Sequence, residues 1–215
     1  MRFNRVKKLW REGKPAIGGW LSIPHCFPAE VMAHAGFDWL CVDMQHGCID
    51  YSDVVPMLTA ISTTNCVPFV RVPWNEPSVI MKVLDAGAYG VIVPMVSNRA
   101  EAERAVAACR YPPVGKRSIS MMTAGTGFLN LPAGEVVARI DPEIALFALV
   151  EEAVFAAGAP ASADVHVYIG VAMLEIPGDG TSLAPEVHRN SGRIVIIEPV
   201  RRGRKERRIP AGLFG

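Results

Sequence analysis

The chain has 215 residues, of which 50% are hydrophobic and 20% charged, and its formal net charge is +1 at pH 7. A chain of this length can bury one sizeable core. A charge so close to zero gives no overall field that would attract nucleic acid or a membrane surface. No apolar run reaches about 18 residues, so no transmembrane helix is expected. The basic segment 1–14 lacks the apolar centre and cleavage site of a secretory signal.

The cysteine content favours reduced, buried thiols over a disulfide framework or a zinc site. The five cysteines are an odd number, and no Cys-x-x-Cys pair occurs. Free thiols are typical of a reducing compartment, so a cytoplasmic location is predicted. The residues are Cys26, Cys41, Cys48, Cys66 and Cys109.

Short apolar runs alternate with longer amphipathic stretches along the first half of the chain. The short runs are nearly continuous in apolar residues, which is typical of parallel strands that are buried on both faces. The longer stretches carry one apolar stripe each, as helices covering such a sheet do. Strands are predicted at residues 16–22, 37–43, 67–72 and 90–95, and helices at 28–35, 51–62, 77–86 and 99–109.

Fewer helices and strands are predicted in the second half of the chain. Further strands are predicted at residues 144–151, 165–170 and 209–215, and a long loop rich in Gly, Pro, Ser and Thr at 111–132. Repeated strand–helix units indicate a parallel α/β fold, either a closed barrel or an open doubly wound sheet. The sequence has neither GxGxxG nor GxxxxGK[ST], which weakens the nucleotide-binding open sheet.

Three successive predicted strands end in residues that can take part in chemistry. Asp43 and His46 follow the second strand, Arg71 ends the third, and Pro94 and Met95 end the fourth. In a barrel the carboxyl ends of the strands meet on one face, where active sites form. An imidazole there is a candidate general base. A buried arginine is costly unless it is functional or ion-paired.

Four segments resemble the HpcH/HpaI aldolase/citrate lyase family, in order and in spacing. They are residues 36–47 (GFDWLCVDMQHG), 70–77 (VRVPWNEP), 84–95 (LDAGAYGVIVPM) and 110–118 (RYPPVGKRS). The similarity extends from residue 9 to about residue 152. It implies a (β/α)8 TIM-barrel fold, assembly as a homohexamer, and cleavage of a 4-hydroxy-2-oxo acid to pyruvate and an aldehyde with the help of a divalent cation.

The resemblance also implies roles for individual residues. His46 matches the catalytic histidine, and Arg71 matches the arginine that binds the substrate and stabilises its enolate. Asp85 matches the acid that orients this histidine from a neighbouring subunit or strand. Glu151, at the end of the fifth strand, matches the first metal carboxylate, and Gly170 stands at a substrate-binding position after it.

One expected metal ligand is replaced. The family motif Gly-Pro-Ala-Asp-Leu corresponds to residues 170–174, which read GVAML, so Met173 stands at the aspartate position. A thioether is a soft ligand and a poor substitute for a carboxylate on Mg²⁺ or Mn²⁺. The implied cofactor, Mg²⁺, Mn²⁺ or Co²⁺, would therefore be held by an incomplete site.

Residues 153–208 are atypical for the family. The segment 154–164 is rich in alanine, the β-branched run 193–199 (RIVIIEP) replaces an expected helix, and 201–208 has six basic residues in eight positions. The basic run is interpreted as a solvated face. The sequence thus predicts a single aldolase-like barrel domain over residues 1–215, incomplete, with about seven strands and without the last strand and helices. A truncated or shifted reading frame is one hypothesis for this pattern.

Three functions stay open at this point. The first is a metal-dependent aldolase that acts on a 4-hydroxy-2-oxo acid. The second is a catalytically impaired or inactive homologue, which Met173 and the missing end favour. The third is a citramalyl- or malyl-CoA-type lyase, against which the chain length and the segment around His46 argue. The sequence leaves the aldehyde open.

Overall fold

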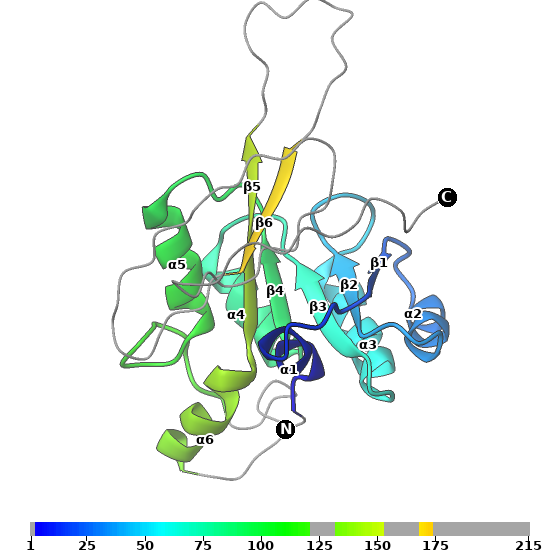
Figure 1. The fold of residues 1–215 in the computed structure, drawn as a ribbon, viewed down its shortest axis with the longest axis horizontal. Coiled ribbons are helices and arrows are strands. Elements are labelled where there is room, and N and C mark those ends of the chain that lie inside the picture. The colour runs from blue at the N-terminus through cyan, green and yellow to red at the C-terminus, as the bar shows by residue number, and fades with distance from the viewer. Residues whose placement is uncertain (1–2, 121–131, 153–167, 174–215) are drawn as a thin grey trace, which may run out of the picture.

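A six-stranded sheet forms the centre of the computed structural model, and the strands follow one another in chain order (Figure 1). The structure describes residues 3–120, 132–152 and 168–173, with the backbone alone for 133, 147–152 and 168–173. The strands are β1 (Gly18–Leu21), β2 (Trp39–Asp43), β3 (Val67–Arg71), β4 (Gly90–Val93), β5 (Ala145–Glu152) and β6 (Tyr168–Met173).

A helix follows each of the first four strands. These helices are α2 (Cys26–His34), α3 (Tyr51–Ser62), α4 (Pro77–Asp85) and α5 (Arg99–Cys109), while α1 (Arg5–Arg11) precedes the sheet and α6 (Ala133–Ile140) precedes β5. Local sequence signals set their starts: Asp50 and Asp53 form a capping box at α3, and the Asn98 side chain accepts from the Glu101 N–H at α5. The predicted helices are confirmed within two residues, but α1 and α6 were not predicted.

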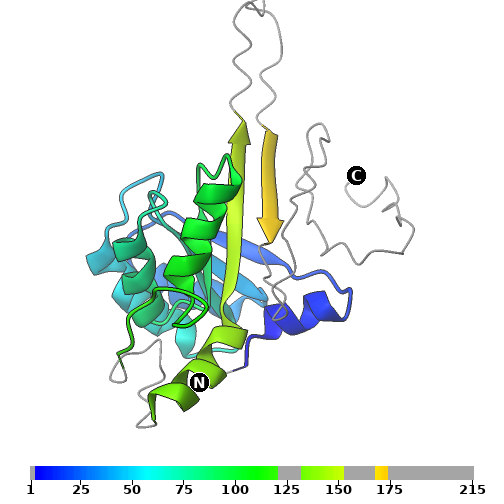
Figure 2. The same ribbon diagram turned by 90° about the vertical axis from the view of Figure 1, so that its left-hand side faces the viewer.

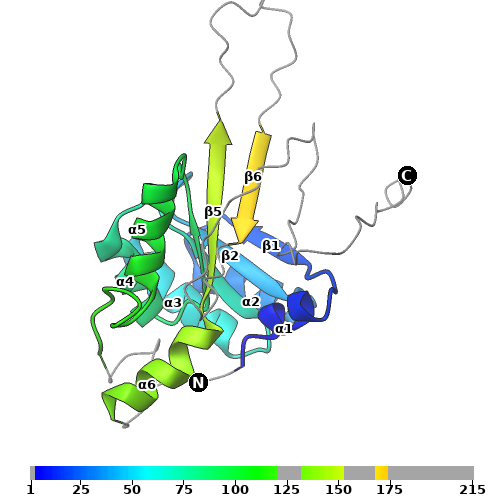
Figure 3. The same ribbon diagram turned by 60° about the vertical axis from the view of Figure 1, so that its left-hand side comes forward.

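The first five strands run parallel, as the strand–helix repeat predicts. Neighbouring strands pair in register from Gly18 opposite Trp39 to Val93 opposite Ala148. Helices α2 to α5 cover one face of the sheet, while α1 lies against the other (Figures 2 and 3). This arrangement confirms the predicted α/β fold of the TIM-barrel type.

Side chains that alternate along the strands build two cores. Leu40, Val42 and Val70 point to the helices, where residues such as Leu58 and Ile80 pack on them. The other face carries the second core, in which α1 contributes one residue; its members include Val6, Cys41, Phe69 and Ile92. A sheet buried on both faces explains why its strands read as continuous apolar runs.

Glycines make room for large rings on the inner face. A Cβ atom at Gly18 would lie 1.9 Å from Trp39 Cε2, and one at Gly90 would lie 2.5 Å from the Phe69 ring. The rings of Trp39 and Phe69 stack on each other with centroids 5.2 Å apart. Because each glycine lies beside a large ring on the neighbouring strand, the rings fill the interior of the curved sheet.

The sixth strand does not follow the barrel pattern. It was predicted at residues 165–170, but it spans Tyr168–Met173 and runs antiparallel to β5, with Phe147 opposite Met173 and Glu152 opposite Tyr168. A parallel neighbour needs a crossover connection, usually a helix, whereas antiparallel pairing does not. The other predictions for 153–208, and the seventh strand at 209–215, lie outside the described residues.

None of the helices in the described ranges combines the length and the apolar character that a bilayer crossing requires.

Candidate active site

An ion pair closes the carboxyl edge of the sheet between β2 and β3. Asp43 and Arg71 are the last residues of these strands and stand opposite each other in register. Arg71 Nε donates to Asp43 Oδ1 at 2.8 Å, and Arg71 Nη2 donates to Oδ2 at 2.5 Å. Only 3% of the Asp43 side chain and 11% of the Arg71 side chain are exposed. The pair is therefore bidentate and buried, the geometry in which an arginine is most firmly held.

Three further N–H groups converge on the Asp43 carboxylate. Trp20 Nε1 donates to Oδ2 at 3.0 Å, while the backbone N–H groups of Gln45 and His46 donate to Oδ1 at 3.0 and 3.3 Å. Burial raises the pKa of Asp43, but the hydrogen bonds from Arg71, Trp20 and Gln45 outweigh it and hold that pKa below its ordinary value. Asp43 is therefore ionised at neutral pH.

Arg71 keeps donors that Asp43 does not use. The ion pair occupies the Nε hydrogen and one hydrogen of Nη2, which leaves three of the five N–H donors, two of them on Nη1, unused by Asp43. The guanidinium carbon lies 4.9 Å from the ring centroid of Trp20, a cation–π contact. A permanently charged, oriented group with donors left over is suited to bind an anionic substrate.

An aromatic layer lies beside this polar pair on the inner face. Trp20 meets Trp39 edge to face, with centroids 6.4 Å apart and planes at 75°. Trp39 in turn stacks on Phe69. Asp43 and Arg71 thus border a layer of packed rings, and the low polarity of that layer strengthens their electrostatic interactions.

The structure brings two of the predicted site residues together. His46 lies on the loop after β2, and its backbone N–H bonds the same carboxylate that holds Arg71. The His46 side chain is exposed. Both residues therefore stand at the carboxyl edge of the sheet, where the sequence predicted them.

Asp85 lies elsewhere in the same chain. It is the last residue of α4, and this helix leads from the end of β3 back to the start of β4. Asp85 is therefore at the amino edge of the sheet, opposite the edge that carries His46. Its carboxylate accepts from Arg117 Nη2 at 2.8 Å. Within one chain, the predicted contact between Asp85 and His46 is not formed.

Arg117 is an unexpectedly buried charge. Its side chain is fully buried and its guanidinium carbon lies 4.6 Å from the Tyr111 ring centroid. Arg117 Nε and Nη1 have no hydrogen-bond partner among the residues that the structure describes. The segment 110–118 signals this residue only through its family resemblance.

Asp43 and Trp20 were not assigned a role from the sequence. The position of Asp43 after the second strand was noted, and the adjacent strand end at Arg71 could have suggested an ion pair. Trp20 carries no such signal, because its contact with Asp43 depends on the curvature and stagger of β1 against β2.

The antiparallel ladder of β5 and β6 places Glu151 next to Gly170 but separates Glu151 from Met173. In the antiparallel ladder Glu151 stands opposite Ile169, Gly170 opposite Val150, and Met173 opposite Phe147. Glu151 and Met173 are thus at opposite ends of the ladder, and their side chains lie outside the described part of the structure. Elsewhere in the described ranges no group of three or more His, Cys, Asp or Glu residues is arranged to hold a metal ion. This donor set does not fit a site for a hard divalent cation.

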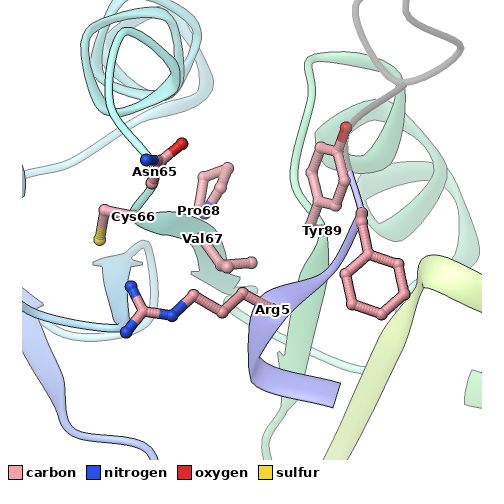
Figure 4. Close-up of a pocket in the computed structure, with 7 residues that line it drawn as sticks. Arg5, Asn65, Cys66, Val67, Pro68 and Tyr89 are labelled. Carbon is pink, nitrogen blue, oxygen red and sulfur yellow. The ribbon is translucent and has the colours of Figure 1, made fainter. Parts of the chain in front are cut away.

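A cavity of about 350 Å³ lies at the amino ends of β3 and β4 (Figure 4). Arg5 extends below Val67 toward the side of Cys66, and Tyr89 lines the opposite side of the cavity. Arg5 is also paired with Asp38 at 2.9 Å. The amino edge of a parallel barrel contributes mainly to stability, so the cavity is separate from the site around Arg71.

The fold and this edge define a TIM-barrel-type α/β protein with a buried arginine at its carboxyl face. The chain belongs to the HpcH/HpaI aldolase/citrate lyase family, whose model matches residues 17–173. Over 138 residues it is 46% identical to a hydroxypyruvate/pyruvate aldolase of Rhizorhabdus wittichii, a stretch that covers 62% of this chain and 55% of that protein.

Two further comparisons agree. The chain is 42% identical over 121 residues to a 4-hydroxy-2-oxo-heptane-1,7-dioate aldolase of Salmonella dublin, covering 56% of this chain and 46% of the relative. A crystal structure of an HpcH/HpaI family protein from Burkholderia cenocepacia superposes with a TM-score of 0.61 at 33% identity, over 67% of this chain and 58% of the other. The chain spans about half the length of the curated relatives it matches.

Proposed function

We propose that this chain is a carbon–carbon lyase that cleaves a 4-hydroxy-2-oxo acid to pyruvate and an aldehyde. The observation that carries the proposal is the buried Asp43–Arg71 pair at the carboxyl edge, with the His46 backbone tied to the same carboxylate. Relatives named as pyruvate aldolase and as 4-hydroxy-2-oxo-heptane-1,7-dioate aldolase support the same chemistry. The particular aldehyde is not part of the proposal.

Arg71 would stabilise the charge that develops during cleavage. When the C3–C4 bond breaks, its electron pair moves toward C2 and leaves an enolate with negative charge on the C2 oxygen. The free Nη1 edge of Arg71 would donate to that oxygen, and the bidentate hold of Asp43 fixes its direction beforehand. A preoriented donor of this kind needs no reorganisation during the reaction.

His46 would act as the general base. Its imidazole would take the proton of the C4 hydroxyl as that oxygen becomes the aldehyde carbonyl. The enolate carbon C3 then receives a proton, which completes pyruvate. An imidazole suits this exchange because its reference pKa is about 6.5. Exposure of the side chain leaves it accessible to substrate.

Asp85 supports a proposal about assembly. If Asp85 orients His46, the two residues must come from different copies, because they lie at opposite edges of the sheet in one chain. We therefore propose a homo-oligomer, and the family resemblance suggests a hexamer. Sedimentation of the full chain tests this: a monomer at micromolar concentration would exclude the role of Asp85.

A divalent cation is part of the proposal by family resemblance alone. Such an ion would act as a Lewis acid on the substrate carboxylate and keto oxygen. Since the donor set on β5 and β6 does not fit it, no step above is assigned to a metal. We likewise propose a single aldolase-like domain over residues 1–215 and a cytoplasmic location.

The test is a coupled assay on the full-length chain. A 4-hydroxy-2-oxo acid is added with Mg²⁺, Mn²⁺, Co²⁺ or a chelator, and pyruvate is followed with lactate dehydrogenase and NADH. Pyruvate release that depends on Arg71 supports the lyase. A folded chain that releases no pyruvate with any cation contradicts it.

A catalytically impaired homologue is the second candidate. The antiparallel pairing of β6 favours it, because that pairing separates Glu151 from Met173. The pyruvate assay separates the two candidates, and Met173→Asp tests the alignment behind them: higher affinity for Mn²⁺ in calorimetry supports the family alignment at this position, whereas unchanged affinity counts against it.

A further inference from the structure

Trp20 contacts both members of the ion pair at the carboxyl edge. Its indole N–H donates to Asp43 Oδ2, the same oxygen that accepts from Arg71 Nη2. Its ring lies under the Arg71 guanidinium at 4.9 Å from the centroid. Trp20 on β1 thus contacts the Asp43 carboxylate through its N–H and the Arg71 guanidinium cation through the face of its ring.

A role in packing alone does not account for this arrangement. Trp20 is 42% exposed, so it buries less of its apolar surface than a core residue does. The neighbouring Trp39 shows the alternative, because its indole N–H reaches only the Ala16 carbonyl at 3.4 Å while its ring stacks in the core. The N–H of Trp20 is instead directed at a carboxylate that is 3% exposed.

We infer that Trp20 is a positioning residue for Arg71, acting through Asp43 and through its own ring face. The carboxylate restrains Arg71 from the Nε and Nη2 side, and the indole restrains it from one face. Among the residues that the structure describes, Nη1 then has no partner and is directed to a substrate anion. The catalytic consequence rests on the proposed lyase function; the restraint of Arg71 does not.

The direct test is the mobility of Arg71 in solution. Replacing Trp20→Phe keeps a ring under the guanidinium but removes the N–H. The hydrogen exchange of the Arg71 Nε–H group, identified by the loss of its NMR signal in Arg71→Lys, is expected to accelerate about tenfold, because the carboxylate that accepts it is less firmly held. Trp39→Phe, which removes an indole N–H from the same layer, is the matched control and should leave this exchange unchanged.

The kinetic readout separates positioning from substrate binding. In Trp20→Phe, kcat for pyruvate release should fall about tenfold, while KM changes less than kcat does. Loss of one hydrogen bond to Asp43 should raise the pKa of that carboxyl, which an NMR titration of the Asp43 carboxyl carbon measures. Trp39→Phe should leave the pKa of Asp43 unchanged.

The pH dependence of the Trp20 indole N–H signal can be measured on the unaltered chain. The Trp20 indole N–H signal should shift as Asp43 titrates, and Asp43→Asn should abolish that shift. Arg71 and His46 are the other ionisable groups around this carboxylate, and Cys41 is a further one nearby. Burial raises the pKa of Cys41, so that thiol stays protonated in the acid range.

Different results would contradict the role of Trp20 and the proposed lyase function. An Arg71 exchange rate in Trp20→Phe equal to that of the unaltered chain, or an indole signal independent of pH, overturns the inference. A chain that releases no pyruvate overturns the proposed function, and the exchange rate then still decides the role of Trp20.

Discussion

An arginine–aspartate pair with one fully or almost fully buried partner lies at each of the two edges of the sheet, and the two pairs differ in how their hydrogen-bond donors are used. At the carboxyl edge Asp43 receives bonds from Arg71, Trp20 and two backbone N–H groups. At the amino edge the fully buried Arg117 has one ion pair, with Asp85, and Nε and Nη1 remain without a partner in the described ranges.

This difference separates a site from a structural contact. At the carboxyl edge the acid accepts five hydrogen bonds, and within the described ranges Arg71 Nη1 has no partner, which is the arrangement needed to bind a further anion. At the amino edge the arginine is enclosed, and its charge depends on one carboxylate that is 25% exposed. Within one chain, the first pair should therefore govern activity and the second should govern stability; an effect of Asp85 on activity would require a second copy.

Arg71→Lys should have the largest effect. Lysine keeps the charge but cannot reproduce the bidentate fork, so kcat/KM for pyruvate release should fall about 100- to 1,000-fold. The coupled pyruvate assay measures this. The control is Arg99→Lys, in the exposed pair with Glu103, which should retain full activity. Equal activity of both variants would contradict the role of Arg71.

Asp85→Asn should lower stability the most. It leaves the buried Arg117 without an anionic partner, at a cost of about 3 kcal/mol in the free energy of unfolding. Urea denaturation measures the change. Glu103→Gln, in an exposed pair, should cost less than about 1 kcal/mol. The double variant Arg117→Met with Asp85→Asn should recover most of the loss, and failure to recover would indicate a different origin.

Gly18→Ala tests the aromatic layer beside the active edge. The added Cβ would overlap the Trp39 ring, so unfolding free energy should fall by about 2 kcal/mol. Gly134 in α6 has no atom within 4 Å of such a Cβ, and Gly134→Ala should stabilise the chain by about 0.5–1 kcal/mol. Thermal denaturation of both variants checks the contrast; a stable Gly18→Ala would exclude close packing there.

The smallest effects should appear in the pH dependence of stability, with opposite signs at the two edges. The pKa of Asp43 is lowered, since its hydrogen bonds outweigh burial, so its contribution is present above the ordinary aspartate pKa and is lost as pH falls through the folded value. At the amino edge, burial raises the pKa of Asp141 despite the charge of Arg110, so stability is lost as pH rises through its folded value.

The variants Asp43→Asn and Asp141→Asn test these opposite pH dependences. At neutral pH the free energy of unfolding should be higher for the unaltered chain than for Asp43→Asn, and this difference should become smaller at acid pH. Asp141→Asn should be more stable than the unaltered chain at neutral pH, and this difference should disappear at acid pH. Urea titrations at several pH values report both gaps, and parallel trends for the two variants would contradict the assignment.

The strands and helices of the first half could be predicted from the sequence because local signals coincide there. Strands buried on both faces leave continuous apolar runs, and Asp50 and Asn98 mark helix starts directly. The direction of β6 could not be predicted in this way. Apolar periodicity identifies a strand but not the sense in which it pairs, which depends on the connection that precedes it.

The site was predictable only in part. His46 and Arg71 could be found because they follow strand ends and match family segments. Their common link through Asp43, and the reach of Trp20 across β1, depend on register and twist, which single residues do not encode. The place of Asp85 followed from chain topology alone: a helix after a parallel strand returns to the opposite edge.

The central claim is that Arg71 at the carboxyl edge binds the keto acid together with His46. A crystal of the full-length chain soaked with pyruvate tests it most directly. The account predicts the pyruvate keto oxygen within hydrogen-bond distance of Arg71 Nη1, with the His46 imidazole facing the same molecule. Pyruvate held elsewhere, with Arg71 contacting only Asp43 and Trp20, would contradict it.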